Sequence, residues 1–117
     1  MTTSTSIEPD QLPAVIRGYL AAHVARDADA ALPAFTPDAV VVDDGVTYAG
    51  AEEIHGFLSG AGAEFTYTTT LVGAERTDDA HWVAINHLEG DFPGGVVDLR
   101  YRFAMDGDRI AELVIAP

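Results

Sequence analysis

The order of two hydrophobic periods along the chain is the feature that most constrains its fold. Helical spacing is confined to the first 60 of 117 residues, and everything after about residue 64 has the pattern of strands. Apolar residues recur on one helical face over 10–25, and shorter helices are predicted over 28–35 and 51–59. Pro33 should kink the helix over 28–35 or end it early. Helices followed by a meander of strands are typical of an α+β domain. We therefore expect one curved, mixed or antiparallel sheet whose concave face is covered by three helices.

The predicted strands are separated by residues that favour turns. A strand over 39–43 is followed by a second over 46–48, and the Asp44-Gly45 dipeptide between them favours a two-residue hairpin. Further strands are predicted over 64–76, 81–89, 96–105 and 109–116. A sheet that curls against helices leaves a cavity, and cavities of this kind bind small molecules.

The chain length fits one domain with one core. No repeat, linker or low-complexity tract divides the sequence, so we expect a single domain over 1–117 with residues 1–6 as a disordered tail. That tail lacks the basic and apolar regions of a signal peptide. No segment approaches the roughly 20 apolar residues of a transmembrane helix. We expect a cytoplasmic protein.

The composition excludes several classes of function. The chain has no cysteine and no lysine, which rules out disulfides, thiolate nucleophiles and Schiff bases. A net charge of −13 argues against binding to nucleic acid or to anionic membranes, because both require neutralised phosphates. The four histidines lack the close paired spacing of metal ligands, and no cofactor motif is present. We expect neither a metal nor a cofactor.

The order helix, helix, hairpin, helix, long meander resembles the nuclear transport factor 2-like superfamily along nearly the whole chain. This superfamily includes ketosteroid isomerases and SnoaL-like polyketide cyclases. In ketosteroid isomerase, a tyrosine on the first helix stabilises the enolate and an aspartate ending the first strand moves the proton. Tyr19, in the stretch YLAA, and Asp43, in VVD, stand where those residues would be, at matching separation. Phe57 matches an aromatic residue that lines the isomerase pocket.

One position departs from the isomerase pattern. The isomerase carries a second aspartic acid on its fifth strand, kept protonated so that it shares the oxyanion with the tyrosine. The corresponding residue here is Leu99, and the neighbouring Asp98 points to the opposite face of its strand. Losing such a donor costs about 10²–10³ in rate, so we do not expect steroid isomerisation.

Two histidines are further candidates. His23 follows Tyr19 by one turn on the apolar face of the first predicted helix. His87 shares a strand face with Val83 and Ile85, and it would be a proton shuttle for the aspartate if that face is inward. The opposite face of this strand is equally apolar, so alternation leaves the choice of face open.

The strand over 96–105 divides into an apolar and a charged face. Leu99, Tyr101 and Phe103 lie on the apolar face, and we expect them to line the cavity together with Phe57 and His23. Charged residues occupy the other face. The resemblance implies that this convex side of the sheet forms a homodimer interface.

Two interpretations of function stay open. In the first, the protein is an isomerase, cyclase or dehydratase for an apolar carbonyl compound, with Asp43 as base and Tyr19 as hydrogen-bond donor. In the second, the same fold is a non-catalytic ligand-binding protein or dimeric scaffold. Tyr19 is then a core aromatic residue, and Asp43 accepts N–H groups of the adjacent turn. The sequence names no substrate.

Overall fold

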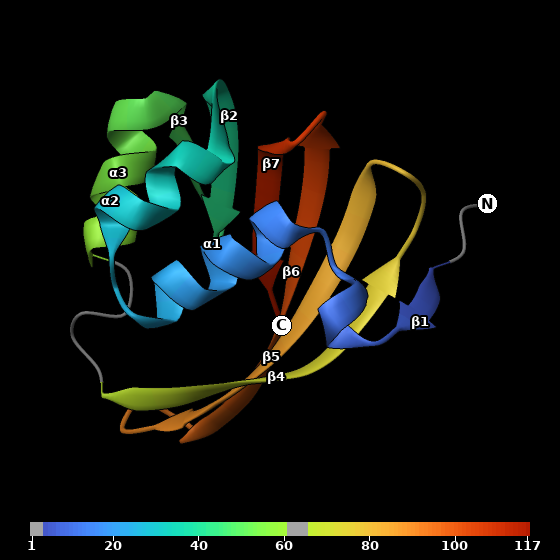
Figure 1. The fold of residues 1–117 in the computed structure, drawn as a ribbon. Coiled ribbons are helices and arrows are strands. Elements are labelled where there is room, and N and C mark those ends of the chain that lie inside the picture. The colour runs from blue at the N-terminus through green and yellow to red at the C-terminus, as the bar shows by residue number, and fades with distance from the viewer. Residues whose placement is uncertain (1–3, 61–65) are drawn as a thin grey trace.

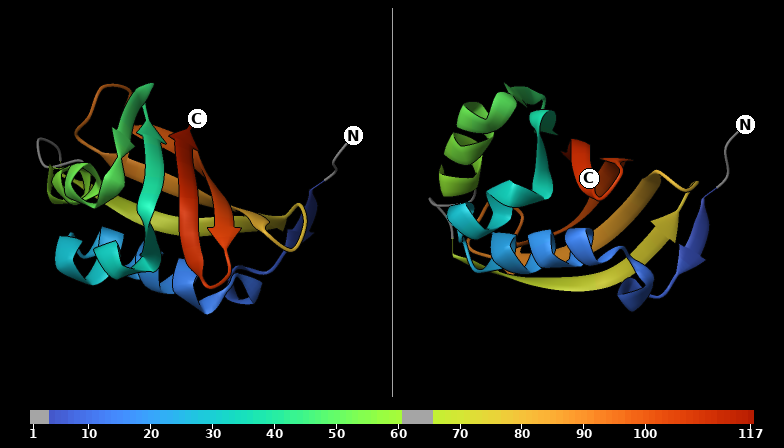
Figure 2. Two further views of the ribbon diagram at one scale, coloured as in Figure 1. Left: turned by 90° about the horizontal axis from the view of Figure 1, so that it is seen from above. Right: turned by 45° about the horizontal axis from the view of Figure 1, so that its top comes forward.

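The computed structural model describes residues 4–60 and 66–117, which form one mixed seven-stranded sheet with helices packed on one side (Figure 1). The sheet bends around the first long helix, so that its concave face encloses the helices (Figure 2). The helices of the described residues are η1 (Pro9–Gln11), α1 (Ala14–Val24), α2 (Ala28–Ala31), η2 (Leu32–Ala34) and α3 (Gly50–Gly60). The predicted α+β plan is confirmed. No helix in the described parts of the chain is long and apolar enough to cross a membrane.

The strands follow the order β1-β4-β5-β6-β7-β2-β3 across the sheet. Their bounds are β1 (Thr5–Ile7), β2 (Phe35–Asp43), β3 (Val46–Ala49), β4 (Tyr67–Arg76), β5 (His81–Gly90), β6 (Val96–Asp106) and β7 (Arg109–Ala116). Neighbouring strands are antiparallel except β2 and β7, which pair in parallel. The parallel pair joins the hairpin β2–β3 to the edge of the later strands. It also places Asp43, at the end of β2, opposite Ile115 near the end of β7.

Prolines set two of the helix boundaries, and one of these differs from prediction. The predicted first helix from residue 10 is split, because residues 9–11 form a separate 3-10 turn and Pro13 stands at the N-cap of α1. The Asp27 side chain caps α2, because its Oδ1 accepts a hydrogen bond from the backbone N–H of Ala30 at 3.1 Å. The expected early end at Pro33 is confirmed: Pro33 has no amide hydrogen to donate, and after Ala31 the helix continues only as a short 3-10 turn.

The predicted hairpin is confirmed, and its turn residues explain it. Asp44 and Gly45 both have positive φ, 53° and 78°, as a two-residue primed turn requires. Strand β2, which precedes this turn, begins at Phe35 rather than at residue 39. Its register with β7 is irregular between Phe35 and Val40. The later strands match prediction within one residue at most ends. The predicted start at residues 64–65 lies outside the described residues, and β4 begins at Tyr67.

The expected tail over residues 1–6 is wrong for its last two residues. Thr5 and Ser6 belong to β1, which pairs antiparallel with the end of β4, Thr5 opposite Arg76. The hydroxyl groups of Ser4 and Thr77 lie 2.9 Å apart beside this strand. Three residues are too few for an alternating pattern to be recognised, so the sequence carries no signal for β1. The first three residues lie outside the described part of the chain.

Register settles which face of β5 is inward. Ala84 and Tyr101 stand opposite each other and belong to the core beneath the helices. Asn86, which is buried and stands opposite Leu99, shares their face. Val83, Ile85 and His87 therefore lie on the convex face.

Candidate active site

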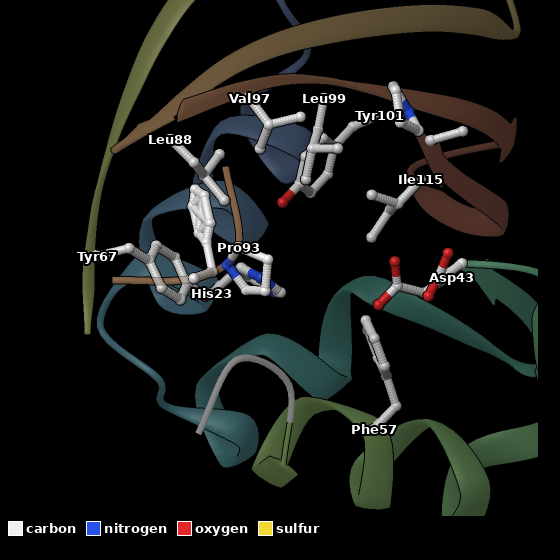
Figure 3. A pocket seen from close by; sticks show the side chains of 14 residues that line it. His23, Asp43, Phe57, Tyr67, Leu88, Pro93, Val97, Leu99, Tyr101 and Ile115 are labelled. Atoms are coloured by element: carbon white, nitrogen blue, oxygen red, sulfur yellow. The ribbon is translucent and has the colours of Figure 1, made fainter. Parts of the chain in front are cut away.

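A cavity of about 470 Å³ lies between the concave face of the sheet and helices α1 and α3 (Figure 3). Small-molecule sites typically enclose roughly 300–1,000 Å³, so the cavity is of suitable size. Its wall is mostly apolar and includes Phe57, Leu88, Phe92, Pro93, Val97, Leu99 and Ile115. The polar side chains on the wall are those of His23, Asp43, Asp44, Tyr67 and Tyr101.

Asp43 ends β2 at the mouth of the hairpin turn, and its side chain is half-buried in the cavity wall. Within the described residues its carboxylate makes no hydrogen bond or ion pair, so it does not cap the Asp44-Gly45 turn. Burial, and secondarily the charge of Asp44, raise the pKa of the Asp43 carboxyl above its ordinary value. A carboxylate with these properties is a stronger base than an exposed aspartate.

Tyr19 lies behind the cavity wall rather than on it. The side chain is 1% exposed, and its hydroxyl is 3.2 Å from Nδ1 of His23, which does line the cavity. Burial raises the pKa of Tyr19 well above its usual value, and the charge of Asp43 adds to that increase. Burial, followed by the charge of Arg26, lowers the pKa of His23. At neutral pH both groups are therefore uncharged. His23, and not Tyr19, is therefore the residue of this pair that lines the cavity.

The two expected aromatic residues of β6 have different environments. Tyr101 is 3% exposed and lines the cavity, together with Leu99. Burial raises the pKa of Tyr101, while a hydrogen bond from the Asn86 side chain opposes that increase. Phe103 is not among the lining residues, because it lies deeper in the core, edge-on to Tyr19 with ring centroids 5.8 Å apart. The expectation that Phe103 lines the cavity is wrong.

The expectation that His87 is a proton shuttle is also wrong. His87 lies on the convex face, where Nδ1 is 2.5 Å from Asp98 and Nε2 is 3.1 Å from Glu89. These hydrogen bonds, that with Asp98 first, raise the pKa of His87. The sheet separates His87 from the cavity, so it has no access to a ligand bound there.

Several lining residues were not predicted from sequence. Tyr67 and the loop at Phe92 and Pro93 reach the cavity because β4 and β5 bring their ends together, Tyr67 opposite Gly90. Asn86 does not line the cavity but lies behind it, and the sequence marks it as the polar residue on an otherwise apolar strand face. Its contact with Tyr101 depends on the pairing of β5 with β6. Within the described residues, no group of three or more histidine or acidic side chains is arranged to hold a metal ion.

Comparison with known proteins adds solved structures of the same fold. No family model matches the chain, and neither does any curated protein. A provisionally named polyketide cyclase from Sinorhizobium meliloti is 30% identical, with 94% of this chain and 100% of that chain covered and a TM-score of 0.85.

Two more distant structures support the fold alone. A protein with a ketosteroid isomerase-like fold from Catenulispora acidiphila, in complex with trimethylamine, is 21% identical, with 90% and 85% of the two chains covered and a TM-score of 0.77. A nuclear transport factor 2-like protein of unknown function from Cytophaga hutchinsonii is 9% identical, with 87% and 85% covered and a TM-score of 0.69. With the cyclase-named relative matched over its whole length, the chain belongs to the nuclear transport factor 2-like superfamily.

Proposed function

We propose that the protein is a cofactor-independent enzyme that moves a proton within an apolar carbonyl compound, in an isomerisation, cyclisation or dehydration. The observation that supports this most is the Asp43 carboxylate, which is half-buried in an apolar cavity and has no hydrogen-bond partner among the described residues. An aspartate with a raised pKa is suited to act as a base near neutral pH. The cyclase-named relative favours the same reaction class.

The chemistry follows from the groups around the cavity. Asp43 takes a proton from the carbon beside the substrate carbonyl, and the electrons of the C–H bond move onto the carbonyl oxygen as an enolate. For an isomerisation, the protonated Asp43 then returns the proton to a different carbon, which restores the carboxylate. The enolate oxygen needs hydrogen-bond donors while it carries charge. The reaction consumes no oxidant, reductant or second substrate.

His23 is the donor that α1 supplies. The Tyr19 hydroxyl lies 3.2 Å from Nδ1 of His23. We propose that the hydroxyl donates to Nδ1 of the neutral imidazole, which leaves the ring proton on Nε2 at the far side of the ring. Tyr19 thus positions His23 and fixes its tautomer, whereas the sequence suggested that Tyr19 contacts the substrate directly.

Proton exchange with solvent tests this proposal even while the natural substrate is unidentified. A panel of apolar ketones and enones is incubated with the protein in heavy water, and deuterium incorporation beside the carbonyl is followed by NMR. Asp43→Asn is expected to lower the exchange rate by about 10²–10⁴, the usual contribution of a general base. Asp38→Asn, at an exposed position on the same strand, is the matched control. Full exchange by Asp43→Asn would exclude Asp43 as the base.

The second candidate function is ligand binding without chemistry. Leu99 favours it, because an apolar residue lines the wall at the position where the isomerase carries its second acid. In this case no compound of the panel takes up deuterium, and ligands bind to wild type and to Asp43→Asn with equal affinity.

We also propose that two copies associate through the convex face of the sheet. Val42, Ile85 and Val114 lie there half-buried, and Arg100 pairs with Glu75 at 2.8 Å beside them. An apolar centre with charged surroundings is typical of protein interfaces. Light scattering should give twice the chain mass of 12.4 kDa, and Val114→Lys should reduce it to one chain. Val24→Lys, an exposed valine on α1, should leave the dimer intact.

A further inference from the structure

We infer that the ligand of the cavity is an organic cation, an amine-bearing carbonyl compound whose ammonium group lies against Asp43, Asp44 and the ring of Phe57. The inference rests on the proposed function, because it names the substrate class of the same site. A protonated tertiary amine and a quaternary ammonium share the required chemistry, a full positive charge beneath a mostly apolar surface.

The charged side chains that line the described part of the cavity wall are both acidic. Asp43 and Asp44 line it, whereas no arginine is among the described lining residues and the chain has no lysine. His23 also lines the wall, but burial lowers its pKa, so it is neutral near pH 7. A ligand with a positive charge balances the two carboxylates, whereas an anionic ligand is repelled by them.

The hairpin turn brings both carboxylates to one cavity. In a regular strand, the side chains of neighbouring residues point to opposite faces. Strand β2 ends at Asp43, and Asp44 has a φ of 53° as the first residue of the turn. This change of backbone conformation ends the alternation, so Asp44 lines the same cavity as Asp43. The described residues that line the cavity offer no cation to offset the repulsion between the two groups.

Aromatic rings form the adjoining wall. The centroid of the Phe57 ring is 6.2 Å from that of His23, and the His23 centroid is 6.0 Å from that of Tyr101. Figure 3 shows the Phe57 ring pointing toward the Asp43 carboxylate. The face of an aromatic ring attracts cations, most strongly where water is excluded. Carboxylates beside a row of rings therefore suit an ammonium group that is only weakly hydrated.

The far end of the cavity is less negative. Tyr67 lines that end, on the opposite side from Asp43 in Figure 3. The guanidinium carbon of Arg26 lies 5.3 Å from the centroid of the Tyr67 ring. The electrostatic potential therefore becomes more negative from Tyr67 toward Asp43. This gradient orients a ligand with one charged end, so that its ammonium group lies at Asp43 and its apolar part lies toward Leu88.

A positive charge on the substrate also assists the proposed reaction. When Asp43 takes the proton from the carbon beside the carbonyl, the electrons of the C–H bond move onto the carbonyl oxygen. An ammonium group near that oxygen stabilises its negative charge. Leu99 lines the wall where the isomerase carries its second acid and has no hydrogen bond to offer. The substrate itself then supplies part of the missing stabilisation.

Two compounds of the same shape test the effect of charge alone. Benzyltrimethylammonium is the cation, and neopentylbenzene is its neutral counterpart, with carbon in place of nitrogen. Affinities are measured from amide chemical shifts in NMR titrations. We expect Asp44→Asn to weaken binding of the cation by roughly three- to fivefold and binding of neopentylbenzene by less than about 1.5-fold. Asn-Gly favours the same hairpin turn as Asp-Gly, so the variant keeps the fold.

Asp38→Asn is the matched control for net charge. It removes one negative charge from an exposed position on β2 outside the cavity lining, so affinity for the cation should stay unchanged. Phe57→Leu tests the aromatic contribution. It should weaken binding of benzyltrimethylammonium by roughly threefold more than binding of neopentylbenzene. Asp44 is exposed on the turn, so its variant gives a result even if the substitution of the buried Phe57 prevents folding.

The inference and the proposed function fail in different ways. Equal affinity of wild type and Asp44→Asn for benzyltrimethylammonium would overturn the inference. No binding of the cation, or shift changes confined to residues outside the cavity, would overturn it as well, even if neutral ketones exchange deuterium. Cation binding as expected, with no exchange for any ketone including an ammonium-bearing one, would instead refute the enzymatic proposal and leave the ligand class standing.

Discussion

The Tyr19 hydroxyl lies 3.2 Å from Nδ1 of His23, one turn further along α1, so the residue that resembles the isomerase tyrosine is separated from the cavity by an imidazole. Tyr19 is held from the other sides by Phe35 and Phe103, both edge-on with ring centroids 5.3 and 5.8 Å away. This packing fixes the hydroxyl and, through it, the orientation of the His23 ring.

The first prediction concerns Tyr19→Phe. The ring packing is kept, but Nδ1 of His23 loses its donor, so both neutral tautomers become populated. Nitrogen NMR of His23 should show protonated Nε2 alone in wild type and a mixture in the variant. We expect stability to fall by about 1–2 kcal/mol and turnover by about tenfold. An unchanged tautomer in Tyr19→Phe would mean that another group orients the ring.

The second prediction is a pH dependence of stability due to His23. Burial lowers its pKa below the ordinary value of 6.5, so near and below that pH the unfolded chain binds more protons than the folded protein does. The His23 contribution to stability is therefore present above pH 6.5 and lost as pH falls below it. His87 acts with the opposite sign, because its pKa is raised.

His23→Gln separates the two histidines. Urea unfolding at about pH 7.5 and about pH 5.5 should show a smaller loss of stability on acidification in the variant than in wild type. His87 and the remaining titrating groups are present in both proteins and cancel in this comparison. Equal losses would show that His23 is protonated in the folded protein at the lower pH.

The sequence predicted the fold well because the signals that define it are local. The helical period before residue 60, the Asp44-Gly45 turn and the alternating segments after it each depend on residues adjacent in the chain. The errors arose where local signals are short or compete, as with the three-residue β1 and the start of α1 at Pro13.

The site was predictable only in part, because it depends on pairing between distant segments. Asp43 came from a resemblance, and the structure places it on the cavity wall. His87 was misjudged because both faces of β5 are half apolar, and only the register with β6 places His87 opposite Asp98 and Asn86 opposite Leu99. Tyr19 was matched to the isomerase tyrosine by its position in the sequence. Its burial behind the cavity wall depends on the rings of His23, Phe35 and Phe103 that surround it.

The third prediction concerns the close approach at Gly90, which faces Tyr67 in the sheet. A Cβ at Gly90 would lie 2.3 Å from the Thr66 carbonyl oxygen and 2.4 Å from the Tyr67 Cβ, so backbone must move. Gly90→Ala should destabilise the protein by about 1–3 kcal/mol and displace a residue of the cavity wall. The expected loss is measured by thermal unfolding.

Gly56→Ala provides the matched control. Gly56 is in α3 with open space around its Cβ position, so alanine there should stabilise the protein by about 0.5–1 kcal/mol. Destabilisation by both variants would point to a general intolerance of alanine, whereas the predicted opposite signs would localise the constraint to the β4–β5 contact.

The last prediction connects the proposed base with stability. The ionised Asp43 is half-buried beside Asp44, and within the described residues no donor compensates it, so its charge is unfavourable in the folded protein. Asp43→Asn should therefore raise the melting temperature at neutral pH while it lowers turnover. Active-site groups often have this cost in stability.

The pH dependence of that gain gives its cause. Because the folded pKa of Asp43 lies above the ordinary 3.8, the folded protein holds its proton at higher pH than the unfolded chain does. The stabilisation by Asp43→Asn should be full above the folded pKa and should disappear as pH falls toward 3.8, where Asp43 becomes neutral in both states. Asp38→Asn, exposed on the same strand, should show neither effect. A gain that persists at low pH would mean that packing, and not the charge, accounts for it.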